Sequence, residues 1–399
     1  METINLKEGI ALVKKYGKLT GKEREMLIKQ RFFALLFHAR EHSELYKELY
    51  SGLGVNFFMR EVPFLDRDYA FAHRDKWKCD ETVEAQIGAA INTVRTFSFD
   101  RDYRAFLLRG SRTVIISATE DSPHVAAWAK NTTLLSVFAP REELVARLNN
   151  LKPALLWAYP STLTKLLEEK KAGRLNIRPV LIMAGGEALT DDLRALLIDA
   201  FNCTVQSTYS SNELGVIASE CQYGHLHVND DWIMLEPLDE EGKPITSGIA
   251  SSVLATNMYK TDYPVIRMTL PDRLNFHDKI CPCGNISPWI SVVSGKDDNI
   301  IFKGQNGDVT IDIDEFRPVF RDIKGIISYQ LLIYAGNNIS LRLKVNDEVM
   351  KPVIFLQAEQ ALRRFFREKD IFISAITLDA SRPLKDEKNG KFRSVVDCR

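Results

Sequence analysis

The sequence predicts an α/β protein with two domains: a large N-terminal domain of mostly parallel sheets with flanking helices, and a small ferredoxin-like α+β domain at the C-terminus. Its 399 residues exceed one ordinary hydrophobic core and suit a domain of roughly 300 residues with a smaller one attached. Short apolar runs alternate with helical stretches through the middle of the chain, and this pattern changes past Asn299. We therefore expect the domains to span residues 1–297 and 298–399.

The N-terminal part is expected to be helical. Between Thr20 and Leu53 the apolar residues recur at helical spacing, as Phe32, Leu35 and Leu36 do. We expect these amphipathic helices on the outside of the α/β body, with packing as their role.

Apolar runs of strand length then follow one another. Strands are expected at 106–108, 114–116, 134–138, 154–158 and 180–183 and around Val205, with helices at 141–149, 161–171 and 190–201. Ligands bind where the carboxyl ends of parallel strands meet. The candidate loops at those ends are Tyr159-Pro160-Ser161, Ala184-Gly185-Gly186-Glu187 and Tyr209-Ser210-Ser211-Asn212-Glu213.

The last hundred residues follow another order. Strands are expected around Val309 and at 327–334, 339–345 and 371–378, with helices at 313–323 and 350–367. This β-α-β-β-α-β order is typical of a ferredoxin-like unit.

Composition narrows the class of partner. Lysine plus arginine and aspartate plus glutamate are equal at 53 each, so nothing indicates a nucleic-acid or membrane-surface protein, and small molecules are expected instead. The N-terminus has no secretory pattern and no apolar run is long enough to cross a bilayer, so we expect a cytoplasmic protein. Its oligomeric state stays open, with a homodimer as one alternative.

The turn from Tyr209 to Gly215 concentrates hydroxyl, amide and carboxylate groups at the end of an expected strand. Such groups can hold phosphate oxygens and Mg²⁺. Asp272, downstream, can accept hydrogen bonds from two ribose hydroxyls at once. The alternative is that the turn is only a turn and that Asp272 forms a surface ion pair.

Six motifs in order carry a resemblance that covers the chain from about Val62 to the C-terminus. They are Gly185-Gly186-Glu187, Tyr209 to Gly215, Leu226 to Asp230, Pro264 to Arg267 with Asp272, Gly295-Lys296-Asp297-Asp298 and Gly390-Lys391-Phe392-Arg393. The sequence resembles the phenylacetate-coenzyme A ligase-like (CapK-like) branch of the ANL superfamily of adenylate-forming enzymes. The resemblance implies ATP-dependent activation of a carboxylic acid, aromatic or otherwise hydrophobic and including acids of secondary metabolism, followed by transfer to a thiol such as coenzyme A.

The resemblance also implies roles for single residues. Lys391 and Glu213 are the expected catalytic residues, Lys391 driving adenylation and Glu213 binding Mg²⁺, while Asp298 is the expected hinge between the domains. The expected nucleotide-binding residues are Gly185, Gly186, Glu187, Tyr209, Ser210, Ser211, Asn212, Asp272 and Lys296. For the acid pocket we expect Trp157, Tyr159 and Ala184, which are aromatic or small residues at strand ends. The alternative for Lys391 is an ordinary solvated basic tail.

A second constellation combines three cysteines and a histidine: Cys221, His227, Cys281 and Cys283. Three thiolates and an imidazole suit tetrahedral Zn²⁺, and four protein ligands leave no position for water, so we expect a structural zinc ion. Gly224 and Gly284 would permit the tight turns that such a site needs. His225 is the alternative to His227, and four separately packed residues are the alternative to a site.

The sequence departs from the family pattern in its first half. Adenylate-forming enzymes carry a serine-, threonine- and glycine-rich loop for the ATP phosphates. Between Gly54 and Gly173 the only glycines are Gly88 and Gly110, and neither lies in such a run. Asn212 and Lys296 also replace the usual threonine and arginine. Two alternatives to an enzyme therefore stay open: a non-catalytic homologue that binds a ligand, and a zinc-stabilised scaffold.

Overall fold

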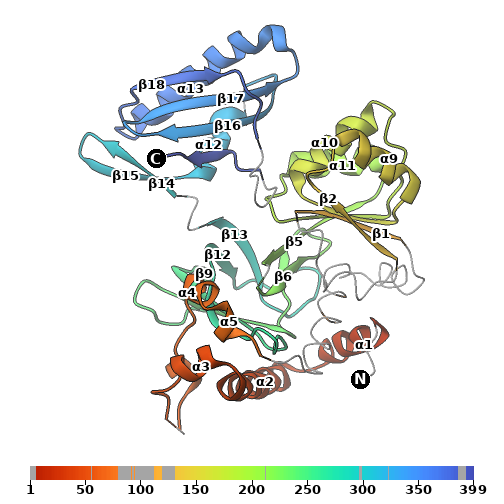
Figure 1. The fold of residues 1–399 in the computed structure, drawn as a ribbon, viewed down its shortest axis with the longest axis vertical. Coiled ribbons are helices and arrows are strands. Elements are labelled where there is room, and N and C mark those ends of the chain that lie inside the picture. Colours follow the sequence, from red (N-terminus) through yellow and green to blue (C-terminus); the bar gives the residue numbers. More distant parts are fainter. Residues whose placement is uncertain are drawn as a thin grey trace. The chain divides into compact units, whose positions relative to one another are not determined.

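The computed structural model describes residues 6–54, 56–79, 91, 94, 112–118, 131–211, 213–295, 299–321, 323–384 and 392–399 (Figure 1). The chain divides into two compact units, Met1–Val292 and Val293–Arg399. Among the residues that the structure describes, no helix is long and apolar enough to cross a membrane.

Helices form the N-terminal part of the first unit, as expected. They are α1 (Leu6–Tyr16), α2 (Gly21–His42), α3 (Glu44–Leu49), η1 (Met59–Glu61), α4 (Arg67–Ala72) and α5 (Arg74–Trp77). A capping box starts α2: the Thr20 side chain accepts from the Glu23 backbone N–H, and the Glu23 carboxylate accepts from the Thr20 backbone N–H at 2.7 Å. The predicted apolar stripe is buried in the larger core cluster of this unit.

A ten-stranded sheet with the order β2-β1-β3-β4-β5-β6-β7-β13-β12-β9 forms the body of the first unit. Its strands are β1 (Thr113–Ser117), β2 (Thr132–Ser136), β3 (Leu155–Ala158), β4 (Leu181–Gly185), β5 (Thr204–Ser211), β6 (Gly215–Glu220), β7 (Leu226–Val228), β9 (Gly248–Ile249), β12 (Asp272–His277) and β13 (Trp289–Gly295). The strands from β2 to β5 pair in parallel, which confirms the expected parallel sheet. From β5 onward the strands β5 and β6, β6 and β7, β7 and β13, and β12 and β9 pair in antiparallel orientation.

Helices α9 (Arg141–Leu151), α10 (Pro160–Lys171) and α11 (Asp191–Phe201) cover one face of the parallel strands. The core between them contains Leu156, Ala158, Ile182 and Ala184. Neighbouring residues of the same strands, such as Leu155 and Met183, point to the opposite face, because side chains alternate along a strand.

A three-stranded antiparallel sheet, which the sequence did not predict, completes the first unit. It contains β8 (Ile233–Leu238), β10 (Ser252–Asn257) and β11 (Val265–Thr269). Leu65 forms an isolated parallel bridge with Met268 of β11, so the segment before α4 lies along this sheet. That contact fixes the position of Arg67, the first residue of α4.

The second unit is a smaller sheet domain, as expected, with β16 (Ile326–Tyr334), β17 (Asn338–Val345), β18 (Ala375–Asp379) and β19 (Val395–Asp397) in the order β18-β17-β16-β19. It also contains β14 (Asn299–Gly304), β15 (Gly307–Asp312), η3 (Ile313–Glu315), α12 (Phe316–Arg321), η4 (Glu348–Met350) and α13 (Lys351–Glu368). On α13, Ile354, Ala358, Leu362 and Phe366 repeat every four residues and are buried in the core.

The strand order of the second unit differs from the expected ferredoxin-like one. Val309 lies in β15, which pairs with β14 in a separate two-stranded sheet, and β19 takes the remaining place beside β16. A turn of two residues between Gly304 and Gly307 closes this hairpin, so a local pairing replaces the long-range pairing that the sequence pattern indicated.

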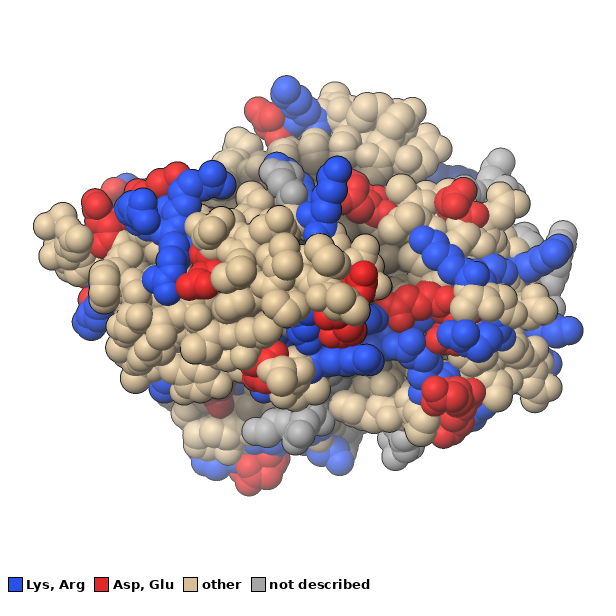
Figure 2. Space-filling model, turned by 90° about the horizontal axis from the view of Figure 1, so that it is seen from above, with Lys and Arg blue, Asp and Glu red and all other residues tan. Residues whose placement is uncertain are grey.

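Acidic and basic side chains are intermixed on the face that Figure 2 shows, and no single charge covers it.

Candidate functional site

The ends of β4 and β5 bring two predicted loops together. Gly185 and Thr208 are register partners on these parallel neighbours, so Gly186 and Tyr209 follow them at the same edge of the sheet. Gly186 has φ +78°, a conformation that side chains rarely tolerate. Gly185 is buried and Gly186 is partly exposed, so Gly186 is the glycine of this loop that presents backbone near Tyr209.

Glu187 has a structural role in this arrangement. Its carboxylate accepts hydrogen bonds from the Ser161 backbone N–H at 2.8 Å and from the Ser161 hydroxyl at 2.9 Å. Ser161 belongs to the first turn of α10, where backbone N–H groups lack helical partners. Glu187 thus fixes the glycine loop to the start of that helix.

Tyr209 reaches Asp272, the first residue of β12. The phenol donates a hydrogen bond of 2.6 Å to Oδ2 of Asp272. Burial, together with the Asp272 charge, raises the pKa of Tyr209 well above its ordinary value, so the phenol stays protonated and remains a donor. An aromatic face and a carboxylate are therefore held together at the strand ends.

Glu213, the expected magnesium ligand, is 7% exposed and pairs with Arg67. Nε and Nη2 of Arg67 donate to Oε1 of Glu213 at 3.1 and 2.8 Å. Burial raises the pKa of the Glu213 carboxyl, but its own backbone N–H and Arg67 outweigh burial and hold that pKa below its ordinary value. Glu213 is therefore an ionised carboxylate with a cation already beside it.

We expect replacement of Arg67 by methionine to lower the free energy of unfolding by about 1–3 kcal/mol at pH 7, because a buried carboxylate loses its partner. Since the folded pKa of Glu213 lies below its unfolded value, its stabilising contribution is present above that unfolded pKa and disappears as the pH falls through the folded pKa. The deficit of the variant should therefore shrink as the pH falls below about 4. Urea denaturation at several pH values measures it.

The matched control is Lys76→Met. Lys76 forms an ion pair of similar length with Glu48, 2.8 Å, but both side chains are more than a third exposed. We expect a loss below about 0.5 kcal/mol for this variant. Equal losses for the two variants at every pH would contradict a special role of Arg67 at Glu213.

Arg67 was not among the residues selected from the sequence. It is 146 positions away from Glu213 along the chain. The sequence around Arg67 indicated only a local feature, the start of a helix, because an Asp-Arg pair after Pro63 is typical of a helix start. In the structure Asp66 caps α4 and accepts a hydrogen bond from the Tyr69 backbone N–H at 2.8 Å.

The three residues predicted for the acid pocket lie in different environments. Trp157 is the residue before the last in β3, and its ring contacts Tyr159 edge to face at 5.5 Å between ring centroids. Tyr159 is buried under the helices, and burial raises its pKa above the ordinary value. Ala184 is fully buried beneath the same helices, so strand alternation places it on the opposite face of the sheet from Trp157.

Four predicted residues, Asn212, Lys296, Asp298 and Lys391, lie outside the described residues, as do Gly88 and Gly110 of the segment where a phosphate loop was sought. Gln330 of β16 forms hydrogen bonds with described residues that precede and follow Lys391 in the sequence. Its amide nitrogen donates to the carbonyls of Leu384 at 2.9 Å and Arg393 at 3.0 Å. Gln330 is 4% exposed and was not identified from the sequence.

The structure brings Cys221, His227, Cys281 and Cys283 together. One ligand atom from each lies within 4.8 Å of the others, and none of these cysteines is in a disulfide. Cys221 follows β6, His227 lies in β7, and the other two lie between β12 and β13. His225 is also close, with Nδ1 3.1 Å from the Cys281 sulfur and its ring stacked on Trp289.

Both cysteine loops have the geometry of metal-binding turns. The backbone N–H groups of Tyr223 and Asn285 donate to the sulfurs of Cys221 and Cys283, each at 3.4 Å, and Gly224 and Gly284 have φ +77° and +78°. Burial raises the pKa of the Cys283 thiol to about 12, which a coordinated cation would reverse.

The tautomer of His227 also fits a metal. Its Nδ1 lies 3.0 Å from the Ser287 carbonyl, which can only accept, so Nδ1 carries the proton. Nε2 is then unprotonated, 3.3 Å from the Cys283 sulfur. A histidine ligand held by a carbonyl in this way is typical of metal sites.

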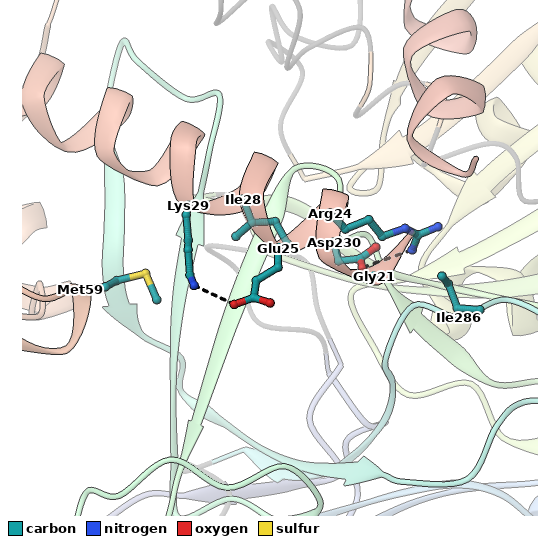
Figure 3. A pocket seen from close by; sticks show the side chains of 8 residues that line it. All are labelled: Gly21, Arg24, Glu25, Ile28, Lys29, Met59, Asp230 and Ile286. Atoms are coloured by element: carbon teal, nitrogen blue, oxygen red, sulfur yellow. Dashed lines mark hydrogen bonds and ion pairs between the residues drawn. The ribbon is translucent and has the colours of Figure 1, made fainter. Parts of the chain in front are cut away.

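A cavity of about 350 Å³ lies elsewhere in the first unit, beside α2 (Figure 3). It is lined by Gly21, Arg24, Glu25, Ile28, Lys29, Met59, Asp230 and Ile286. Its charged side chains pair with each other: Lys29 with Glu25 at 2.7 Å and Arg24 with Asp230 at 3.5 Å. None of the predicted nucleotide-binding or metal-binding residues lines it.

No family model matches the sequence. Protein CapK of Staphylococcus aureus is 24% identical over 218 residues, which cover 50% of this chain and 47% of CapK, so the chain matches about half the length of that relative. Its activity and partners therefore do not transfer directly.

Among solved structures, 2-hydroxyisobutyryl-CoA ligase in the postadenylation state, in complex with an acyl-AMP, superimposes with a TM-score of 0.72 at 17% identity, over 97% of this chain and 92% of the ligase. The amide bond synthetase McbA of Marinactinospora thermotolerans superimposes with a TM-score of 0.52 at 12% identity, over 78% of this chain and 65% of McbA. The chain thus has the fold of the adenylate-forming ligases, as its resemblance implied.

Proposed function

We propose that this protein activates a carboxylic acid as its acyl-adenylate. A carboxylate oxygen attacks the α-phosphorus of ATP, the bond from that phosphorus to the β-phosphate oxygen breaks, and pyrophosphate leaves with the electron pair. The observation that carries the proposal is the convergence of Gly186, Tyr209, Asp272 and Glu213 at the strand ends of a fold shared with adenylate-forming ligases.

Different described residues would contact different parts of the nucleotide. The glycine loop and Tyr209 would sandwich adenine, and Asp272 would accept from the ribose hydroxyls, which compete for it with the Tyr209 phenol. Ser210 and Ser211 would contact phosphate oxygens, and Glu213 would hold Mg²⁺. Mg²⁺ would neutralise phosphate charge as the bond to pyrophosphate breaks.

The remaining roles fall to residues outside the described part of the chain. Lys391 would stabilise the charge that develops on the α-phosphate, Lys296 would contact the nucleotide, and Asp298 would act as the hinge between residues 1–297 and 298–399. In the described part of the chain, Gln330 donates hydrogen bonds to Leu384 and Arg393, which precede and follow the segment with Lys391 in the sequence.

A thiol such as coenzyme A is the proposed acceptor. Its sulfur attacks the acyl carbon, the thiol proton is released, and AMP leaves. The similarity to a CoA ligase supports this choice of acceptor. An aromatic or other hydrophobic acid is the substrate class that the sequence resemblance implies.

We further propose a structural zinc ion bound by Cys221, His227, Cys281 and Cys283. The three free thiols, the N–H···S bonds and the tautomer of His227 fit this ion. Zinc would join the loop between β12 and β13 to the β6–β7 hairpin and would not take part in the reaction.

One observation favours a second candidate, a non-catalytic homologue that binds a ligand. Arg67 already neutralises Glu213, so the carboxylate has a partner without any metal. Together with the missing phosphate loop, this pairing suits a protein that keeps the binding surface and lacks ATP chemistry.

Pyrophosphate release from Mg-ATP tests the proposal, with a panel of aryl, medium-chain and short-chain acids. We expect release that depends on both ATP and one acid of the panel. Absence of release across the panel, with adenylate binding retained in calorimetry, would favour the non-catalytic candidate.

A further inference from the structure

Three residues from adjacent strands meet on the sheet face away from α9–α11. They are Trp157 of β3, Gly185 of β4 and Thr208 of β5, and Gly185 and Thr208 are register partners. Gly185 and Thr208 directly precede Gly186 and Tyr209, the proposed adenine contacts. An acyl group joined to a nucleotide held there would extend along this face.

Trp157 limits the room on this face. A Cβ atom at Gly185 would lie 2.9 Å from Cζ2 of Trp157 and 3.0 Å from its Nε1, closer than real contacts allow. The indole therefore packs directly on the strand end, next to the buried Met183. An aromatic acid would have to displace it.

Thr208 provides a hydrogen-bonding group without a partner. Its side chain is 6% exposed, and among the described residues its Oγ1 has no hydrogen-bond partner. A Cβ atom at Gly185 would lie 3.1 Å from Oγ1 of Thr208 and 3.0 Å from Nε1 of Trp157, so the hydroxyl and the indole N–H both lie close to Gly185. Buried hydroxyl groups are normally satisfied, so an unsatisfied one beside a binding surface indicates a missing ligand atom.

From this geometry we infer that the acid is short and carries a hydroxyl or similar polar substituent. This substituent forms a hydrogen bond with Thr208, and Trp157 closes the acid site at the end away from the nucleotide. This inference rests on the proposed function and narrows its substrate class, in contrast to the aromatic acid that the resemblance implies. Thr208 acts in it as a specificity residue and Trp157 as the size limit.

Two matched pairs of acids test the inference in ATP–pyrophosphate exchange: lactate against propionate, and 2-hydroxybutyrate against butyrate. Benzoate is tested as the aromatic acid. We expect the wild-type kcat/KM to favour each hydroxylated acid by at least about tenfold, because the site loses a hydrogen bond with the other member of the pair. Thr208→Val should bring that ratio close to one. Trp157→Ala should raise kcat/KM for benzoate at least about tenfold.

Thr113→Val is the matched control. Thr113 is another buried threonine of this sheet, and its Oγ1 also has no hydrogen-bond partner in the part of the chain that the structure describes. It lies at the opposite end of β1 from the strand ends of the site. The control should keep the wild-type ratios. Equal use of both members of each pair, or benzoate as the best wild-type substrate, overturns the inference.

Binding of non-hydrolysable acyl sulfamoyl adenosines separates this inference from the proposed function. Calorimetry would compare the lactoyl and benzoyl compounds. If exchange fails with every acid, but the lactoyl compound binds at least about tenfold tighter and Thr208→Val removes the difference, the inference stands and the catalytic proposal fails. Equal binding of the two compounds, or binding of neither, overturns the inference.

Discussion

Replacement of Cys281 by serine is expected to release a zinc ion from the chain and to lower the melting temperature by several degrees. The purified wild-type protein should contain zinc at about one equivalent, measured by mass spectrometry of the metal. Cys281 lies 3.7 Å from the Cys221 sulfur and is 2% exposed, so the variant leaves a buried, incomplete ligand set. Loss of a structural metal is among the most destabilising changes, on the order of 3 kcal/mol or more.

Cys398→Ser is the control for this prediction, because Cys398 is an exposed cysteine in the second unit. It should keep both the zinc and the melting temperature. The proposed metal site would be wrong if the wild-type protein contained no zinc and the Cys281→Ser variant were as stable as the wild type.

Replacement of Lys391 by alanine is expected to reduce acid-dependent pyrophosphate release roughly 100-fold or more, because a cation aimed at charge that develops in the transition state contributes about that much. Binding of the acyl sulfamoyl adenosine should change far less, since the proposed contacts of Gly186, Tyr209 and Asp272 remain. Stopped-flow measurement of the single-turnover rate, with calorimetry of the same variant, gives both quantities.

Lys388→Ala changes the same charge in the same sequence segment, three residues earlier. We expect its turnover to stay within about twofold of wild type, because no contact with the nucleotide is proposed for Lys388. If Lys388→Ala and Lys391→Ala slow the reaction equally, the C-terminal segment acts through its general charge, and Lys391 has no special role.

Periodicity predicted the parallel half of the large sheet and its helices, because each apolar run there is strand-length and each helix has its own stripe. The antiparallel strands were harder to predict. Strands such as β7, with three residues, and β9, with two, are too short to carry a period. In the second unit the hairpin of β14 and β15 replaced a predicted strand pairing, because a two-residue turn favours the local partner.

The candidate site depended on two kinds of information. The cysteine and histidine cluster and the loop residues were visible as spacing in the sequence, and the structure brings the four predicted metal ligands together. Contacts between distant segments were not visible: Arg67 at Glu213 requires the segment before α4 to lie along β11. Trp157 and Ala184 illustrate the same limit, since the register between β3 and β4 decides which side chains share a face.

The central claim is that a carboxylate oxygen becomes bonded to the α-phosphorus of ATP. The most direct measurement supplies the acid with both carboxylate oxygens labelled as ¹⁸O, adds ATP and a thiol or hydroxylamine as acceptor, and analyses the products by mass spectrometry. The account predicts AMP that carries one ¹⁸O atom, because the bridging oxygen of the acyl-adenylate leaves with AMP. Unlabelled AMP, or ADP together with labelled inorganic phosphate, would contradict it.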